Sequence, residues 1–479
     1  MGTKVVKFGG SSLASAAQIV KAMDIVRSDP DRRYVVASAP GKRTPDDTKV
    51  TDLLYQVYGR RDGDYGETLS LIKRRFTEIA QGLGVRIDLA AEFREIEYHL
   101  RSFPHQDDAR HPQGKASETS GYSLEYMASR GEYLNSKIIA AYLEWPFVDA
   151  EEVVRFTESG EFDAESTDNL LASRLGEYEH AVIPGFYGAM PSGRTRIFPR
   201  GGSDVTGALV ARAVDADVYE NWTDVSGMYA ADPRIVDSPR AIEWISYSAL
   251  RELTYLGASV LHEDAIAPVR EKGIPINIRN TNRPDDAGTW IEPDDSGTGL
   301  SGDPIEDDDS IGFPVSTLVG LAGRTGYTSL TIRKSQWSGQ FGVGPALLSV
   351  FADERMIIDM VVASVDTWTI VLRADPDQID VVSSRIVAEL NADSVEVRTD
   401  LVLLGVVGTS APKPDQQARK GSFPTVNLGL KAADALANEG IWVFAMSSPG
   451  GFNTVDAHLL VIEAARYEDA VRCLYAALT

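Results

Sequence analysis

The feature that most constrains this chain is the segment of residues 198–234, in which a helical pattern and a strand pattern are each bordered by small and polar residues. The segment opens with a Gly-Gly turn and three polar side chains: Arg200, Ser203 and Asp204. An apolar strand over residues 217–222 then ends at Thr223 and Asp224. Helix N-termini attract anions, and polar groups just beyond strand ends form the nucleotide sites of open α/β sheets. The segment therefore predicts an α/β sheet with a site for an anionic ligand.

A second glycine-rich turn lies near the N-terminus. Residues 3–8 read as a buried strand that is broken at Gly9 and Gly10, and a helical pattern runs over residues 15–28. Each turn alone is a weak signal, because glycines before a helix are most often simple turn residues. Together they predict a phosphate-binding geometry, in which Lys7 at the strand end reaches the same anion.

Length and composition place the chain among large globular proteins. It has 479 residues, which suggests about three domains, and its 43% of hydrophobic residues can fill several cores. The 47 basic and 70 acidic side chains give a formal net charge of −23. Because such a charge repels phosphate backbones and anionic lipid, we expect neither nucleic-acid nor membrane partners.

Cysteine and histidine usage argues against disulfides and metal-ligand clusters. Cys473 is the only cysteine, which excludes an intrachain disulfide and fits a reducing cytoplasm. The six histidines show no ligand-like spacing with cysteines, so we predict no metal-ligating residues. No signal peptide opens the chain and no apolar run is long enough to span a membrane, so we expect a cytoplasmic protein.

The order of strand and helix patterns predicts three folded parts and a linker. Alternating strands and helices indicate a three-layer α/β domain over residues 1–293, in which the charged helical segment 59–120 reads as an inserted lid without chemistry. Residues 294–325 read as an acidic linker. Residues 326–400 and 401–479 each follow a βαββαβ order, which predicts a tandem pair of small α+β domains that can interleave.

Two local predictions concern single elements. Ser129 to Gly131 would open a helix over residues 132–143, with Glu132 in its first turn, where an acid complements the helix dipole. In the C-terminal third, residues 327–332, 394–399 and 401–407 are predicted as separate strands.

The motifs in this order resemble those of the aspartate kinases of the amino acid kinase superfamily. The matching stretches are KFGGSSLA at residues 7–14, SRGEYLNS at 129–136, RGGSDVTGALVA at 200–211, WTDVSGMYAADPR at 222–234 and GASVLH at 257–262. The paired βαββαβ units resemble the regulatory ACT domains of that family. The resemblance implies an amino acid kinase sandwich followed by two ferredoxin-like ACT domains.

The resemblance also implies roles for individual residues. Lys7, Gly9 and Gly10 would hold the transferring phosphates, and Asp204 would organise the lysine and the phosphoryl path. The nucleotide pocket would be lined by Thr223, Asp224, Tyr229, Arg234, Ser259 and Val260. L-Aspartate would be held by Ser38, Thr51, Glu132, Arg200, Gly201, Gly202 and Ser203, with Glu132 facing its ammonium and Arg200 its carboxylate.

The chemistry of such a reaction fits these residue types. A side-chain carboxylate with a pKa of about 3.9 is ionised at neutral pH, so it needs no general base. The site must neutralise charge, because an anionic nucleophile approaches anionic ATP, and Lys7, helix N-termini and Mg²⁺ suit that task. We therefore expect ATP and Mg²⁺ as cofactors. The sequence contains neither a Walker motif nor the HRD and DFG motifs of protein kinases.

One position departs from the family pattern. Many members have lysine where this chain has Ser259, and proline where it has Glu263. The missing cation would be replaced by Lys42, Arg43 or Lys49 from the long loop, or ATP would bind more weakly.

The resemblance further implies feedback by an amino acid at the ACT pair, with lysine the first candidate and threonine the second. Asp359 would meet the effector ammonium, Ser364 would add a hydroxyl, and the loop around Gly344 would bind the carboxylate. A homodimer or a dimer of dimers through the ACT domains is expected. Two alternatives stay open, namely a sister amino acid kinase acting on glutamate, acetylglutamate or a nucleotide, and a catalytically inactive amino-acid sensor.

Overall fold

The computed structural model describes most of the chain as two compact units. The described residues are 2–60, 64–102, 124–199, 201–258, 261, 265–293, 317–337, 341–409, 428–448 and 455–479. The first unit comprises residues 1–228 and 260–296, and the second comprises residues 229–259 and 297–479. By their contacts, residues 229–259 thus belong with the C-terminal part, whereas the predicted domain boundary falls near residue 293 and stays a prediction.

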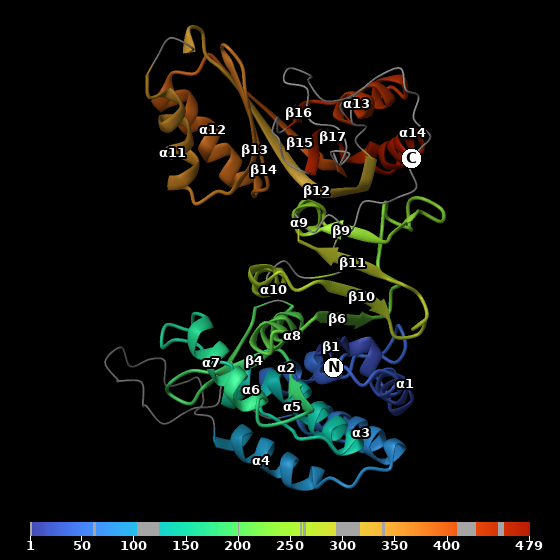
Figure 1. The fold of residues 1–479 in the computed structure, drawn as a ribbon. Helices are drawn as coiled ribbons and strands as arrows, with labels where there is room; N and C mark the ends of the chain where they lie inside the picture. The colour runs from blue at the N-terminus through green and yellow to red at the C-terminus, as the bar shows by residue number, and fades with distance from the viewer. Residues whose placement is uncertain are drawn as a thin grey trace, which may run out of the picture. The chain divides into compact units, whose positions relative to one another are not determined.

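A parallel sheet forms the centre of the first unit (Figure 1). Its strands lie in the order β3 (Ala181–Pro184), β2 (Arg32–Ala37), β1 (Lys4–Phe8), β6 (Val218–Thr223), β10 (Ile276–Asn280) and β11 (Thr289–Glu292). Neighbours are parallel from β3 to β10, and β11 runs antiparallel to β10. These strands are apolar along most of their length, as expected for a parallel sheet covered on both faces.

Helices cover both faces of this sheet and give the predicted three layers. One face packs on α1 (Ala16–Arg27), α2 (Val50–Gly59), α3 (Gly66–Leu83), α4 (Leu89–Ser102) and α5 (Leu124–Leu143). The other face packs on α8 (Gly202–Ala213), which contacts α7 (Ala164–Leu175) and α10 (Ile266–Lys272). Because side chains alternate along a strand, Phe8 and Trp222 point to the first layer, while Lys7 and Asn221 point to α8.

Shorter elements connect these layers. They are the 3-10 turn η1 (Gly10–Leu13), α6 (Ala150–Val153), β4 (Tyr187–Ala189), β5 (Thr195–Ile197) and β7 (Met228–Tyr229). The turn η1 follows the first Gly-Gly directly, and α1 begins only after Ser15, whose side chain accepts the N–H of Gln18. The predicted strand, Gly-Gly and helix are therefore present, with a 3-10 turn inserted between the glycines and the helix.

The prediction that Glu132 lies in the first turn of a helix is wrong. Helix α5 begins at Leu124, so Glu132 lies in its middle and is 6% exposed. The helix passes close to Ala39 at Gly131. A Cβ added to Gly131 would lie 2.7 Å from the Ala39 Cβ, so glycine allows this close approach. The glycine marks close packing rather than a helix start.

The segment 59–120 stays a prediction as a lid, but the described helices in it also contribute to the core. Helices α3 and α4 bury Leu69, Ile72, Phe76, Phe93, Ile96 and Leu100 in the same core as the central sheet. Arg75 of α3 is buried and donates to the carbonyl of Gly41 and to Asp47. These helices are a packed layer that supports the loop after β2.

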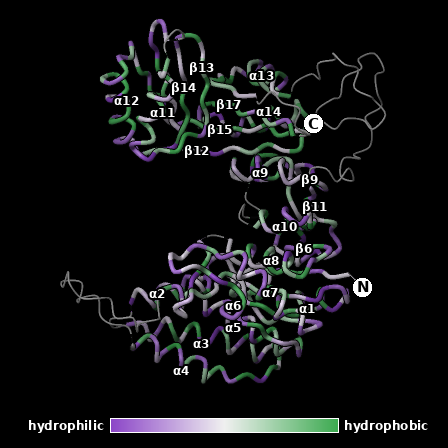
Figure 2. The backbone as a smooth tube through the Cα atoms, turned by 60° about the vertical axis from the view of Figure 1, so that its left-hand side comes forward, coloured by the Kyte–Doolittle hydropathy of each residue, from purple (hydrophilic) through white to green (hydrophobic). Residues whose placement is uncertain are grey.

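The second unit is built on one antiparallel sheet. Its strand order is β13 (Ile358–Ala363), β14 (Thr367–Leu372), β12 (Thr317–Arg333), β15 (Ser394–Thr409), β17 (Val455–Glu463) and β16 (Ala445–Ser447). Two pairs of helices cover it in two separate cores: α11 (Val343–Asp353) with α12 (Pro376–Leu390), and α13 (Leu428–Asn438) with α14 (Tyr467–Leu478). Figure 2 shows hydrophobic residues recurring along β12, β15 and β17.

Two long strands join the halves of this sheet. β12 pairs with β15 from Thr317 to Arg333, so the strands predicted separately at 394–399 and 401–407 are one strand. β12 also begins inside the segment expected to be linker. The first part of β12 lies in the α13–α14 half, and its second part lies in the α11–α12 half. The two ACT-type domains are therefore interleaved, which agrees with the predicted fold class.

The second unit contains four further short elements. β8 (Ala241–Ile242), β9 (Trp244–Ser246) and α9 (Tyr247–Tyr255) precede this sheet in the chain, and η5 (Ala464–Arg466) follows β17. Leu253 of α9 and Leu256 just after it pack against Gly320 and Gly405, where side chains would leave no room. Helix α9 is thereby seated on the long strands.

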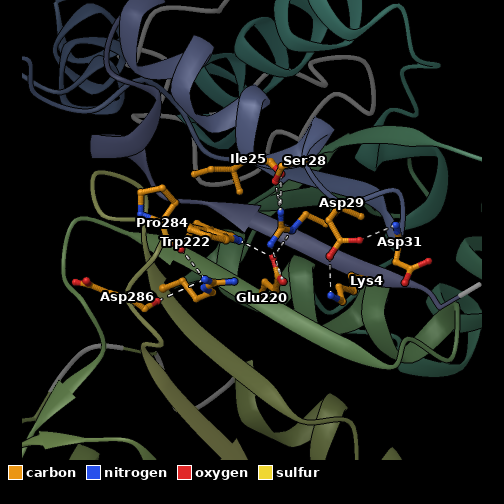
Figure 3. Close-up of polar contacts among 11 residues, drawn as sticks. Lys4, Ile25, Ser28, Asp29, Asp31, Glu220, Trp222, Pro284 and Asp286 are labelled. Carbon is orange, nitrogen blue, oxygen red and sulfur yellow. Dashed lines mark hydrogen bonds and ion pairs between the residues drawn. The ribbon is translucent and has the colours of Figure 1, made fainter.

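A buried ion pair in the first unit gives a stability prediction. Arg32 donates its Nε to Glu220 Oε2 at 2.8 Å, and Trp222 Nε1 donates to the same oxygen at 2.8 Å (Figure 3). Replacing Arg32 by Met leaves a buried carboxylate without its cation, so we expect a loss of about 3–5 kcal/mol in the free energy of unfolding. Urea denaturation measures it.

The pair of Lys4 and Asp29, whose side chains are 28% and 24% exposed against 7% and 4% for Arg32 and Glu220, is the more exposed control. Asp29→Asn should cost at most about 1 kcal/mol. Equal losses for both variants would show that burial does not govern the Arg32–Glu220 pair.

Candidate active site

The carboxyl ends of four parallel strands meet at one edge of the first sheet. Phe8 pairs with Ala37 and with Trp222, and Ala37 pairs with Pro184. The residues after these positions lie side by side at this edge: Gly9, Ser38, Gly185 and Thr223. Three of the predicted site residues are therefore brought together by strand register alone.

Lys7, Asp204 and Asn221 form a triangle beneath this edge. Lys7 Nζ lies 2.5 Å from Asp204 Oδ1 and 3.4 Å from Asn221 Oδ1. The Asn221 amide donates to Asp204 Oδ1 at 2.9 Å. The lysine and aspartate side chains are only 9% and 17% exposed. The Asn221 amide, as a second donor to Asp204, therefore helps to fix the geometry of the pair. Sequence reasoning missed Asn221, because its pairing with Lys7 appears only once β1 and β6 lie side by side.

Ala39 connects the phosphate turn to the helix that carries Glu132. A Cβ on Gly10 would lie 2.9 Å from the Ala39 carbonyl oxygen, so only glycine fits there. The backbone N–H of Ala39 donates to the Glu132 carboxylate. Gly10 and Glu132, which the resemblance assigns to phosphate and to substrate, thus contact the same residue.

Glu132 is a buried carboxyl group that has no cation beside it among the described residues. Burial raises its pKa to about 8, although hydrogen bonds from backbone N–H groups partly oppose this. Its Oε2 has no hydrogen-bond partner among the described residues. Two further atoms of α5 share this property: Asn135 Oδ1 and Ser136 Oγ. Polar atoms buried without partners are rare in proteins, and a cluster of them on one helix fits a polar ligand with an ammonium group.

The N-terminus of α8 lies against the end of β3. Gly201 is in the left-handed conformation, with φ 56°, which requires glycine at this N-cap. Ser203 packs on Gly185, since a Cβ there would lie 2.6 Å from Ser203 Oγ. Gly202 packs in the same way on Phe186. Thr51 lies in the first turn of α2, a helix that packs on α5.

The predicted nucleotide residues are placed in different parts of the structure. Thr223 Oγ1 donates to Asp224 Oδ1 at 3.2 Å at the end of β6. Tyr229 and Arg234 belong to the second unit, and there the Arg234 guanidinium binds Asp232 at 2.6 Å. Arg200, Ser259 and Val260 lie outside the described residues.

Of the loop cations predicted to replace the family lysine, Arg43 is held by carboxylates. It binds Asp47 at 2.8 Å and Glu78 at 3.2 Å. Lys42 donates to the carbonyl of Pro45 and is exposed. The two lysines, Lys42 and Lys49, are thus better suited than Arg43 to supply a charge to a ligand.

The predicted effector residues lie on the α11–α12 half of the second unit. Asp359 on β13 accepts hydrogen bonds from the hydroxyls of Tyr255 and Tyr327, the second at 3.4 Å. A Cβ on Gly344 would meet the Trp368 ring at 3.1 Å, and Ser364 is an exposed turn residue. Burial, followed by the hydrogen bond to Asp359, raises the pKa of the Tyr255 hydroxyl, so it remains a donor at neutral pH.

The described residues contain neither a metal-type cluster nor a helix that could cross a membrane. No cluster of three or more His, Cys, Asp or Glu side chains there has the arrangement of a metal site. In the same part of the chain, no helix combines the length and apolarity that crossing a membrane requires.

Comparison with known proteins places this fold and site in a family. The model of the amino acid kinase family matches residues 2–280, which is more than half of the chain. The chain therefore belongs to the amino acid kinase family of phosphotransferases.

Individual relatives narrow the assignment. Aspartokinase 3 of Bacillus subtilis is 36% identical over 85% of this chain and 86% of its own length. The crystal structure of Clostridium acetobutylicum aspartate kinase is 35% identical, covers both chains fully and has a TM-score of 0.80. E. coli aspartokinase III in complex with aspartate and ADP shares the fold at 24% identity, with a TM-score of 0.68 over 99% of both chains. Within its family the chain is thus one of the aspartokinases, which are ATP-dependent kinases.

The triangle around Lys7 gives a testable prediction. Asn221→Ala removes the amide that bridges Lys7 and Asp204, so we expect kcat to fall at least about tenfold with a smaller change in KM for ATP. Steady-state kinetics separates the two constants. The control is Asn169→Ala on the exposed face of α7, which should leave kcat unchanged. An unchanged kcat in Asn221→Ala would contradict a positioning role.

Proposed function

We propose that this protein transfers the γ-phosphoryl group of ATP to the side-chain carboxylate of L-aspartate, giving 4-phospho-L-aspartate and ADP. The reaction is the first step toward lysine, threonine and methionine. The observation that supports it best is the position of Glu132, a buried carboxyl group with an unpartnered oxygen. Ala39 lies between Glu132 and the phosphate turn, since its N–H donates to Glu132 and its carbonyl lies against Gly10. An α-ammonium group is the natural partner for such a carboxylate.

The proposed substrate is held at the edge where the strands end. Glu132 binds its ammonium, Ser38, Thr51 and Ser203 supply hydroxyls, and Arg200 binds its α-carboxylate. Gly201 and Gly202 leave room for the backbone of α8 to approach it. The side-chain carboxylate of the substrate then points toward Gly9 and Gly10, where the γ-phosphate lies.

The proposed chemistry is positioning and charge neutralisation. Lys7 places its ammonium against the transferring phosphate, and Asp204 with Asn221 holds that ammonium in place. Mg²⁺ would neutralise the phosphates when bound with ATP. Thr223, Asp224, Tyr229, Arg234, Ser259 and Val260 complete the proposed nucleotide site.

The proposed regulator is lysine, with threonine second, bound at the ACT-type domains through Asp359, Ser364 and the loop at Gly344. E. coli aspartokinase III has been crystallised with lysine and aspartate, which makes lysine the first compound to test. We also propose a cytoplasmic homodimer, or a dimer of dimers through these domains, because ACT sheets commonly pair between chains.

Hydroxylamine trapping of acyl phosphate tests the proposal. With ATP, Mg²⁺ and L-aspartate, we expect hydroxamate to form, and we expect lysine or threonine to reduce it. L-Glutamate, N-acetylglutamate and nucleotides are the comparison acceptors. Product only with one of these would favour a sister kinase, and binding of amino acids without any turnover would favour a sensor.

The pH dependence of substrate binding follows from Glu132. Below a pKa of about 8 its carboxyl group is mostly protonated in the free protein, so binding of the ammonium must displace a proton. We therefore expect kcat/KM for aspartate to rise as pH increases toward 8. Glu132→Gln should lower kcat/KM by about 100-fold or more and flatten the profile. A wild-type profile that is flat from pH 6 to 8 would contradict this role.

Regulation gives a second prediction. Because Tyr255 and an effector ammonium compete for Asp359, Tyr255→Phe should lower the half-inhibitory lysine concentration by about three- to tenfold. Tyr327→Phe removes a longer contact with the same carboxylate and should act less. Asp359→Asn should abolish inhibition. Inhibition curves at fixed substrate measure all three, and full inhibition of Asp359→Asn would refute the assigned role.

A further inference from the structure

A cavity of about 480 Å³ lies in the first unit, on the face of the sheet opposite to Lys7 and α8. It opens between α1, the ends of β6 and β10, and the loop after β10. Arg32, Trp222 and Arg279 form its inner part, and its volume suits a small organic ligand. None of the residues assigned to substrate, phosphate or effector lines it.

The buried charges behind the cavity are paired, apart from Arg279. Glu220 accepts two hydrogen bonds from Arg32 and one from Trp222 Nε1, so its acceptor capacity is used by groups behind the cavity (Figure 3). Arg32 Nη1 donates to the carbonyl of Ile25 and to the hydroxyl of Ser28. The Arg32–Glu220 pair is therefore saturated and neutral.

Arg279 has no such partner. Its guanidinium lies over the Trp222 ring, 4.6 Å from the centroid, and donates only to the backbone carbonyls of Pro284 and Asp286. Its Nε is buried and has no acceptor among the described residues, and no carboxylate of that part of the chain lies within ion-pair distance. Burial lowers the pKa of this group, the attraction of Glu220 opposes this effect, and the repulsion of Arg32 adds to it, while Asp285 and Asp29 contribute smaller attractions. A half-buried cation without a direct ion-pair partner is costly unless a ligand completes it.

The rim of the cavity does not cancel this charge. Lys21 adds a second cation, whose ammonium contacts Asn282. Asp24 and Asp285 are exposed, and Asp24 faces Arg27 at 4.0 Å. Exposed carboxylates are screened by water and salt, whereas the inner guanidinium is not.

We propose that this cavity is a binding site for a small anion bearing a phosphate or carboxylate group, held by Arg279 and Lys21. The guanidinium fork suits planar or tetrahedral oxyanions equally, so the chemistry is shared by phosphate esters and by di- or tricarboxylates. The side-chain amide of Asn282 at the cavity wall supplies a further donor.

The cavity is joined to the phosphate turn by three hydrogen bonds. The Gly9 N–H donates to the carbonyl of Trp222 at 2.9 Å, Ser12 and Thr281 share a hydroxyl contact of 2.7 Å, and the Thr281 N–H donates to the carbonyl of Thr223. A ligand on Trp222 and Thr281 thus touches residues that hold Gly9 in place. Binding there would change nucleotide affinity, which is the definition of an allosteric site.

Calorimetric titration of the full-length protein with inorganic phosphate and, separately, with citrate tests the proposal. We expect saturable binding of at least one anion that weakens about tenfold or more in Arg279→Met, since a charge-assisted contact is lost. Arg283→Met is the matched control, because Arg283 lies on the same loop, is exposed and does not line the cavity. It should bind as the wild type does.

Phosphate binding alone would identify a phosphate ester site, citrate binding alone a carboxylate site, and both a general oxyanion site. Arg279→Lys keeps the charge without the fork and should show an intermediate loss, which guards against misfolding of the Met variant. Equal affinity in wild type and Arg279→Met, or no saturable binding in the wild type, overturns the proposal. The titration needs no turnover, so its outcome is independent of the proposed kinase reaction.

Discussion

The pairing of β1 between β2 and β6 is the interaction on which the rest of the first unit depends. It sets the register that brings Gly9, Ser38 and Thr223 to one edge, and it turns Lys7 toward α8 and Phe8 toward α1. A shift of one residue would exchange these faces and bury Lys7 in the apolar core. The site draws on the strands and on their ends. Lys7 and Asn221 lie within β1 and β6, whereas Gly9 and Ser38 come from the turns and loops that follow the strands.

Burial then divides the charged groups of the first unit into three kinds. Arg32 and Glu220 neutralise each other and serve the fold. Lys7 and Asp204 also neutralise each other, but they do so at a strand end, where a phosphate can compete for the lysine. Glu132 and Arg279 are buried to different degrees and form no ion pair among the described residues, so we propose that each is completed by a ligand of opposite charge. The cost of leaving a charge unpaired is the reason that these two positions are informative.

In the second unit the long strands β12 and β15 run through both ACT-type domains and join them in one sheet. Each strand lies in both halves, and their ladder, which has register shifts near Leu318 and between Thr325 and Ser329, joins the two halves. Helix α9 rests on this ladder through Leu253 and Leu256, and Tyr255 at its end bonds to Asp359. A ligand at Asp359 would therefore act on α9, which leads directly to the segment with Ser259.

The sequence by itself determined the fold class, the motifs and the family. The glycine turns, the apolar strands and the βαββαβ order are local patterns, and local patterns suffice for elements and for a resemblance carried by motifs. Three-layer packing and a pair of ACT-type domains followed from them.

Tertiary structure decided the features that depend on distant neighbours. Gly131 lies in the middle of α5, where the lack of a side chain allows Ala39 to pack on it, and the neighbouring Glu132 is buried. The joining of two predicted strands into β15 needed the whole length of β12 as a partner, and Asn221 gained its role only when β1 and β6 were set side by side. The isolation of Arg279 likewise arises from Arg32 and Glu220, which are far from it in sequence. Periodicity shows which face of an element is buried, but it does not show which residues that face packs against. Those neighbours determine which charges in a site are paired.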